Sequence, residues 1–139
     1  MKLLDMCDAE TASVPLDATA ERAIQLMLDR HVGAVAVVDE KQRVAGIFTE
    51  RDVLRRLSLS GRDPRTTPIR DVMTTPVEMA TRATTPGEAL ATMVDRHYRH
   101  LPIVEDDGRL LGMLSIRNVL QARIAVLTRQ LDQARSVIL

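Results

Sequence analysis

The chain has 139 residues, which is the size of one compact domain or of two small halves that depend on each other. Its 19 lysine and arginine residues balance 19 aspartate and glutamate residues, so no overall basic charge favours nucleic acid or an anionic membrane as a partner. Phe48 and Tyr98 are the only phenylalanine, tyrosine or tryptophan residues, which excludes the stacked aromatic surfaces that bind single-stranded nucleic acids.

Cysteine content and hydropathy indicate the cellular compartment in which the protein is expected. Cys7 is the only cysteine, so no internal disulfide is possible and a reducing compartment is expected. The longest purely apolar run, residues 34–38, is far too short to cross a bilayer. The first ten residues contain one lysine and a short apolar stretch, unlike a secretory leader. We therefore expect a cytoplasmic protein with no membrane partner.

An internal repeat organises the chain. A shift of 66 residues aligns residues 19–54 with residues 85–120 without a gap, and twelve of the thirty-six pairs are identical, against about two expected by chance. The repeat divides the chain into four segments. They are a first repeat (1–60), a linker (61–68), a second repeat (69–122) and a C-terminal helical extension (123–139).

In the first repeat, a short strand is expected near residues 14–16. Apolar residues then recur with the spacing of a helix that buries one face, over residues 20–31. Two runs rich in β-branched residues, 34–38 and 43–48, predict strands joined by a polar turn. Thr49 then begins another helix, and a segment with one glycine and two prolines, residues 59–68, connects the repeats.

The second repeat predicts the same elements in the same order. A strand is expected at residues 77–79, a helix at 86–97 with a proline in its first turn, and strands at 101–104 and 109–114. Ser115 begins the last helix. The fold class is therefore mixed α/β (α+β), with two pseudo-symmetric β-α-β-β-α halves and a long C-terminal helix.

Three stretches carry a resemblance to a known family: "HVGAVAVVDEKQRVAGIFTERDVL", "RDVMTTPV" and "RHYRHLPIVEDDGRLLGMLSIRNVL". They resemble the cystathionine β-synthase (CBS) domain, and their tandem order resembles the CBS pair called a Bateman module. The resemblance implies two halves packed through their sheets around two clefts. In this family the clefts bind AMP, ADP, ATP, S-adenosylmethionine or NAD species, and binding commonly regulates a partner protein.

A motif at the start of the last helix of each repeat has two interpretations. Thr49 and Asp52 have the spacing of a capping box, and Ser115 and Asn118 form a weaker version of it. The same geometry suits a nucleotide, since a helix N-terminus attracts phosphate and a carboxylate accepts hydrogen bonds from both ribose hydroxyls. The resemblance assigns one pair to each cleft. Because Asn118 replaces a carboxylate, the two clefts should differ, with the stricter requirement for a ribose diol at Asp52.

The resemblance adds further cleft positions, in the lead-in to the second repeat and at the start of its strand: Thr75, Val77, Arg99, His100 and Pro102. Arg51 and Arg55 lie one helical turn apart, and they either meet phosphates or form a solvated face. The histidines at 31, 97 and 100 predict no metal site. A site needs three or four converging ligands, whereas the second of these ends a helix and the third begins a strand.

The C-terminal segment carries an a/d heptad seam, with steps of four and three residues: Leu120, Ile124, Leu127, Leu131, Ala134 and Ile138. Fewer than three heptads are present, so the helix either pairs with another copy or folds back onto its own domain. Because CBS pairs usually associate as dimeric discs, we favour a homodimer with paired C-terminal helices.

No enzyme signature stands in the sequence: it has no nucleophile elbow and no glycine-rich phosphate loop. The sequence therefore predicts a non-enzymatic regulatory module that binds an adenosine-containing ligand between its halves and signals to an effector protein in trans. No obligatory cofactor is expected. The alternative is an interaction or dimerisation module whose clefts stay empty.

Overall fold

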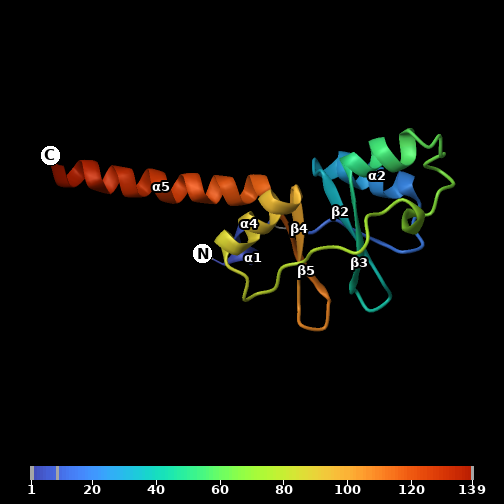
Figure 1. Ribbon diagram of the computed structural model, residues 1–139, viewed down its shortest axis with the longest axis horizontal. Coiled ribbons are helices and arrows are strands. Elements are labelled where there is room, and N and C mark those ends of the chain that lie inside the picture. The colour runs from blue at the N-terminus through green and yellow to red at the C-terminus, as the bar shows by residue number, and fades with distance from the viewer. Residues whose placement is uncertain (1, 9, 139) are drawn as a thin grey trace.

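The computed structural model describes residues 2–8 and 10–138, which form two similar halves and a projecting helix (Figure 1). The first half contains β1 (Ser13–Pro15), α2 (Ala20–Arg30), β2 (Ala34–Val38), β3 (Val44–Thr49), α3 (Glu50–Asp52) and a π-type helical segment, η1 (Val53–Ser58). The second contains a 3₁₀ turn, η2 (Ile69–Asp71), then α4 (Pro86–Arg96), β4 (His100–Val104), β5 (Leu110–Ser115) and α5 (Ile116–Ile138). A short helix, α1 (Leu3–Met6), precedes both.

Helices α2 and α4 begin and end in the same way. The hydroxyl oxygens of Thr19 and Thr85 accept hydrogen bonds from backbone N–H groups three residues ahead, at 3.2 and 3.1 Å, and thereby cap the two N-termini. His31 and His97 adopt left-handed backbone conformations, with φ of 54° and 59°, and end the helices. Both predicted helices are confirmed, each one residue shorter at its C-terminus because these histidines are caps.

The strands of the two halves pair alike except at one edge. In the first half β1 lies parallel to β2, and β2 lies antiparallel to β3. In the second half β4 and β5 form an antiparallel pair of the same register, shifted by 66 residues. The predicted strands near 14–16, 34–38, 43–48, 101–104 and 109–114 are confirmed to within one residue at each end.

The predicted strand at 77–79 is wrong, and Pro102 gives the reason. In the first half the Ala36 N–H donates to the Ala12 carbonyl at 3.0 Å and starts the pairing of β1. Proline stands at the repeat-related position in β4 and has no N–H to donate. Among the described residues 77–81, only Ala80 therefore pairs with β4, through an isolated bridge.

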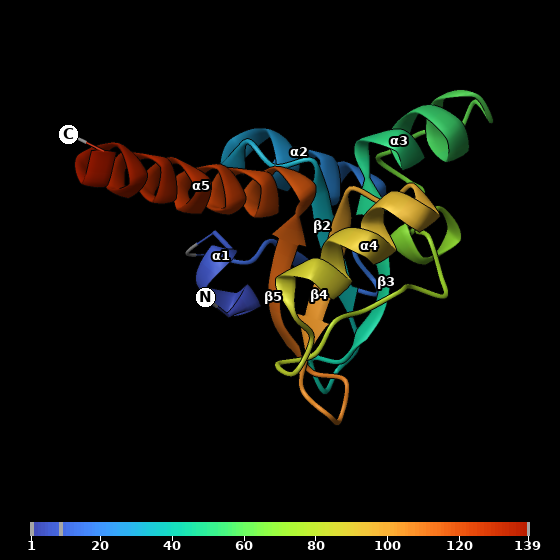
Figure 2. The same cartoon turned by 60° about the vertical axis from the view of Figure 1, so that its left-hand side comes forward.

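Each lead-in segment packs on the other repeat. Side chains of Ile69, Val72 and Met73, at the start of the second repeat, lie in the hydrophobic core of the first. Leu3 and neighbouring side chains of α1 lie in the core of the second half, and α1 lies beside β5 (Figure 2). The two cores are therefore completed by exchange, which makes the halves depend on each other.

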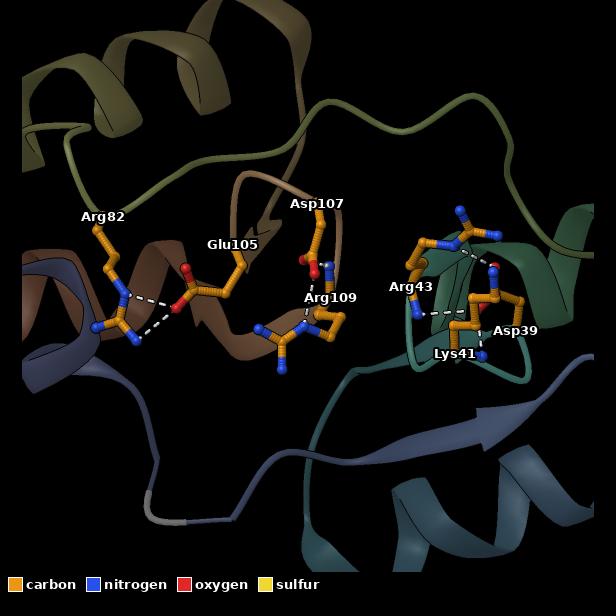
Figure 3. Close-up of polar contacts among 7 residues, drawn as sticks. All are labelled: Asp39, Lys41, Arg43, Arg82, Glu105, Asp107 and Arg109. Carbon is orange, nitrogen blue, oxygen red and sulfur yellow. Dashed lines mark hydrogen bonds and ion pairs between the residues drawn. The ribbon is translucent and has the colours of Figure 1, made fainter.

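The two hairpin turns also join the halves, through reciprocal hydrogen bonds. The Val44 N–H donates to the Gly108 carbonyl at 3.0 Å, and the Leu110 N–H donates to the Gln42 carbonyl at 2.9 Å. These bonds are related by the 66-residue shift, so a pseudo-two-fold axis passes between the turns. Ion pairs within each turn, Asp39 with Arg43 and Asp107 with Arg109, hold the turns in shape (Figure 3).

Helix α5 projects away from the rest of the molecule (Figure 1). It has 23 residues and is about 34 Å long at 1.5 Å per residue. Its seam residues from Leu120 to Leu131 are exposed, so the helix does not fold back onto its own domain. The last seam position, Ile138, has a side chain outside the described residues.

Candidate ligand-binding cleft

The motif at Thr49 is a complete capping box. The backbone N–H of Asp52 donates to the Thr49 hydroxyl at 3.3 Å, and the Thr49 backbone N–H donates to Oδ2 of Asp52 at 3.0 Å. The Thr49 hydroxyl also donates to this oxygen, at 3.2 Å. Local sequence therefore fixes the carboxylate at the start of α3.

The second carboxylate oxygen of Asp52 is occupied as well. Oδ1 accepts a hydrogen bond of 2.9 Å from the hydroxyl of Thr74 and lies 3.4 Å from Nε of Arg56. The Arg56 guanidinium also donates to the Met73 carbonyl at 3.1 Å. Asp52 is only 5% exposed, so its carboxylate faces groups of its own chain.

The repeat-related motif at Ser115 is less crowded. The Ser115 backbone N–H and hydroxyl donate to Oδ1 of Asn118 at 3.1 and 2.7 Å, and the Asn118 backbone N–H donates to the serine hydroxyl at 3.0 Å. Within the described part of the chain, the Asn118 side-chain NH₂ makes no hydrogen bond. The amide therefore has donors left for a ligand.

A cleft of about 670 Å³ opens in front of this motif and runs between the two halves. Its volume suits a small molecule. The second half contributes residues from the beginning of β4, the end of β5 and the first turns of α5, and the first half contributes the chain before β1 and the turn between α2 and β2. The lining residues include Ser115, Asn118, Arg99, His100, Arg117, Arg30, Asp8, Glu10, Thr11, Gly33 and Glu50.

Charged groups of both signs line the cleft. Arg30 pairs with Glu10 at 3.8 Å, whereas Arg99 and Arg117 make no ion pair with another described residue. Unpaired guanidinium groups beside a helix N-terminus are suited to phosphate. The cleft can therefore accept an anionic group at one part of its wall and hydrogen-bonding groups at another.

His100 occupies the cleft wall at the boundary between the halves. Its ring lies close to Gly33, because a Cβ atom at that glycine would stand 3.4 Å from the histidine Cε1. Burial, followed by the nearby Arg99 guanidinium, lowers the pKa of His100. The imidazole is therefore held in its neutral form more strongly than a free histidine, and it can both donate and accept a hydrogen bond.

The structure brings some predicted site residues together and separates others. Ser115, Asn118, Arg99 and His100 line one cleft. Pro102 is buried within β4 and does not line it. The remaining predicted residues do not line this cleft: Thr49 and Asp52 lie at the start of α3, Thr75 and Val77 lie between η2 and α4, and Arg51 and Arg55 have exposed side chains on α3 and η1.

Several residues of the two sites were not predicted from the sequence. Arg56, one position beyond the predicted Arg55, is the arginine that pairs with Asp52. Thr74, one position before the predicted Thr75, is the threonine that bonds to Asp52, whereas the Thr75 hydroxyl donates to the Ala45 carbonyl. Arg117 could have been predicted as a site residue, because the 66-residue shift aligns it with the predicted Arg51.

The described residues form neither a metal site nor a membrane-spanning helix. No group of three or more histidine, cysteine, aspartate or glutamate side chains there could hold a metal ion. His31 and His97 cap helices, and His100 lies at the cleft. No helix in the same residues is both long and apolar enough to span a membrane.

Two repeat-related halves, in which a helix, a β-hairpin and a second helix follow one another, exchange their lead-ins around a polar cleft and define a tandem module of two small domains. The chain belongs to the CBS-domain family, since the CBS domain matches residues 5–59 and 69–125. This confirms the resemblance seen in the sequence, including the tandem order.

The sequence is similar to proteins that are longer than this chain. It is 32% identical over 124 residues to an uncharacterized protein of Methanopyrus kandleri, a match that covers 87% of this chain and 63% of that protein. It is 38% identical over 110 residues to the mitochondrial CBS domain-containing protein CBSX3 of Arabidopsis thaliana, covering 76% of this chain and 53% of that protein.

Solved structures show the same fold. A putative signal-transduction protein with CBS domains from Burkholderia ambifaria superposes with a TM-score of 0.79 at 30% identity, over 90% of this chain and 95% of that one. A CBS domain protein of Pyrobaculum aerophilum, solved in complex with AMP, has a TM-score of 0.77 at 22% identity, over 85% of this chain and 89% of that one. The predicted fold, a pair of CBS domains, is therefore confirmed.

Proposed function

We propose that this chain is a regulatory module that binds an adenosine-containing ligand between its two CBS domains and passes the occupancy of the cleft to an effector protein in trans. AMP, ADP and ATP are the first candidates, followed by S-adenosylmethionine and NAD. The cleft at Ser115 and Asn118 carries this proposal. The AMP complex of the Pyrobaculum protein supports an adenosyl ligand for the fold.

The cleft offers a partner for each part of such a ligand. Arg99 and Arg117 supply positive charge for phosphate, beside the N-terminus of α5. Asn118 and Ser115 supply hydrogen-bonding groups for the ribose. The base would lie against aliphatic side chains, since the cleft lining includes Val32, Ala34 and Met113 and no phenylalanine or tyrosine.

The proposed role is regulation without catalysis. A signal requires that the ligand bind two conformations of the module with different affinities. The cleft is suited to this because both halves contribute to its wall, so a bound ligand changes the free energy of their relative arrangement. We therefore expect binding to alter the surface that the module presents to its effector.

Thermal unfolding with AMP, ADP, ATP, NAD and S-adenosylmethionine, each added separately, tests the proposal. A ligand that binds only the folded state stabilises it by mass action, by about 2.7 kcal/mol at a hundredfold excess over Kd. We expect at least one compound to raise the melting temperature and Asn118→Ala to reduce that shift. A melting temperature unchanged by all five compounds would contradict the proposal and favour a ligand-free interaction module.

We also propose that the module is a homodimer, because of its exposed apolar residues. Two repeat-related pairs are exposed on the helices, Leu28 with Val94 and Leu54 with Leu120. A surface with this internal symmetry fits a two-fold interface, in which each copy presents the same patch. Leu120 also begins the a/d seam on the projecting part of α5, so a second copy of this chain would cover both surfaces.

A further inference from the structure

We infer that the chain binds its adenosyl ligand at only one of the two repeat-related motifs, the one at Ser115 and Asn118, because side chains of the chain itself close the other. This inference rests on the proposed function and deepens it. It concerns which cleft is used and how many ligands one chain takes.

The Asp52 motif is closed to a ligand because groups of the chain itself already contact both oxygens of the carboxylate. An ionised carboxylate has about four acceptor positions. Two donors from Thr49 occupy Oδ2, and the Thr74 hydroxyl and Arg56 guanidinium face Oδ1 at 2.9 and 3.4 Å. A ribose diol would have to displace Thr74 and Arg56 to reach this carboxylate.

The two closing groups are themselves held in place. Backbone hydrogen bonds join Thr74 to Ile47 of β3 in both directions, at 2.8 and 3.0 Å, so the threonine belongs to an extension of the first sheet. Arg56 is held by the Met73 carbonyl as well as by Asp52. Thr74 therefore closes the motif as part of the folded sheet, and Arg56, whose side chain is 49% exposed, covers it from the surface.

Neither closing group has a counterpart at the other motif. The 66-residue shift places Asp8 opposite Thr74 and Ala122 opposite Arg56. An ionised carboxylate cannot donate a hydrogen bond, and alanine has no polar side-chain atom. The two motifs therefore differ at two sequence positions that lie outside the motifs themselves: Thr74 corresponds to Asp8, and Arg56 corresponds to Ala122.

Asp8 also lines the open cleft, which is the one at Ser115 and Asn118. The open motif lacks the helix carboxylate, because Asn118 stands where Asp52 stands in the first repeat. The Asp8 carboxylate, in the lead-in of the first repeat, keeps an acceptor for ligand hydroxyl groups in this cleft. The open cleft thus combines an amide from α5 with a carboxylate from the lead-in of the other repeat.

Calorimetric titration of the full chain with AMP tests the inference. We expect a single AMP per chain. The repeat-related variants Asn118→Ala and Asp52→Asn serve as a matched pair, with circular dichroism as the check of folding. Asn118→Ala should weaken AMP binding by about tenfold, the effect of losing one or two hydrogen bonds, and Asp52→Asn should change it by less than about threefold.

The outcomes separate this inference from the function on which it rests. Two AMP molecules per wild-type chain, or a larger loss of affinity in Asp52→Asn than in Asn118→Ala, would overturn the single-site inference and leave ligand sensing intact. The wild-type stoichiometry tests the number of sites even where a variant does not fold, and the comparison of the two variants tests which motif is used. Absence of binding by AMP and by the other four compounds would overturn the proposed function and this inference with it.

Discussion

The hydroxyl of Thr74 donates a hydrogen bond of 2.9 Å to Oδ1 of Asp52, although the two residues belong to different repeats. The bond joins the lead-in of the second repeat to the helix that ends the first. Because each lead-in completes the core of the opposite repeat, such contacts couple the folding of the two halves.

Replacement of Thr74 by valine tests the strength of this coupling. The variant keeps the shape of the side chain but removes its donor, which leaves a largely buried carboxylate oxygen with Arg56 as its remaining side-chain partner. We expect a loss of about 1–2 kcal/mol in the free energy of unfolding, measured with urea. Thr75→Val removes an exposed hydrogen bond to the Ala45 carbonyl and should cost less. Equal losses would contradict the special role of Thr74.

A pair of glycine variants tests how closely the lead-in of the second repeat, at Met73 and Thr74, approaches β3. A Cβ atom at Gly46 would stand 2.5 Å from Sδ of Met73 and 3.0 Å from the Thr74 carbonyl oxygen. Since the backbone oxygen cannot move without breaking the pairing with Ile47, Gly46→Ala should destabilise the protein by about 1–3 kcal/mol.

Gly87→Ala is the matched control for that variant. Gly87 lies in α4, and a Cβ atom there would meet nothing within 4 Å. Alanine should stabilise the helix by up to about 1 kcal/mol. Urea unfolding of both variants checks the two opposite changes in stability, and a Gly46→Ala protein as stable as wild type would show that the lead-in of the second repeat adjusts.

Most of the secondary structure could be predicted because its signals are local. Thr19 and Thr85 cap helices through bonds that span three residues, and the β-branched runs of β2 and β4 stand out in the sequence. Because the two repeats match at a shift of 66 residues, each of these signals occurs twice in the sequence. The strand predicted at 77–79 was wrong because its pairing depends on a donor that Pro102, more than twenty residues away, does not have.

The candidate site was harder to predict, because its decisive contacts cross between the repeats. The spacing of Thr49 and Asp52 predicts the capping box, but nothing local shows that Thr74 and Arg56 occupy the free side of the carboxylate. Asp8 enters the open cleft only through the exchange of lead-ins. A repeat alignment pairs equivalent residues and does not show which repeat each lead-in packs against.

The pKa of His100 predicts a dependence of stability on pH. Burial and the Arg99 guanidinium lower this pKa in the folded protein, so the unfolded chain binds the proton at a higher pH. The stability contributed by the neutral imidazole is complete above the ordinary histidine pKa of about 6.5 and is lost as the pH falls toward the lower folded value.

Urea unfolding of wild type and His100→Gln at about pH 7.5 and pH 5.5 measures this effect. Acidification should cost the wild type more stability than it costs the variant, because glutamine does not titrate. Asn118→Ala changes the same cleft without removing a titrating group, and it should keep the wild-type pH dependence. An equal loss in wild type and His100→Gln would show that other groups cause the acid sensitivity.

The seam of α5 predicts the assembly state. Leu127 lies in the middle of the seam and is 63% exposed in the single chain, and pairing with a second copy would bury it. Leu127→Glu places a charge in that interface. Burial of an unpaired charge costs far more free energy than its exposure to water, so the dimer should dissociate. Ala125→Glu makes the same change of charge at an exposed position off the seam and should leave the dimer intact. Sedimentation equilibrium measures both variants: the mass should halve only for the seam variant, and a wild-type protein with the mass of one chain would contradict the proposed dimer.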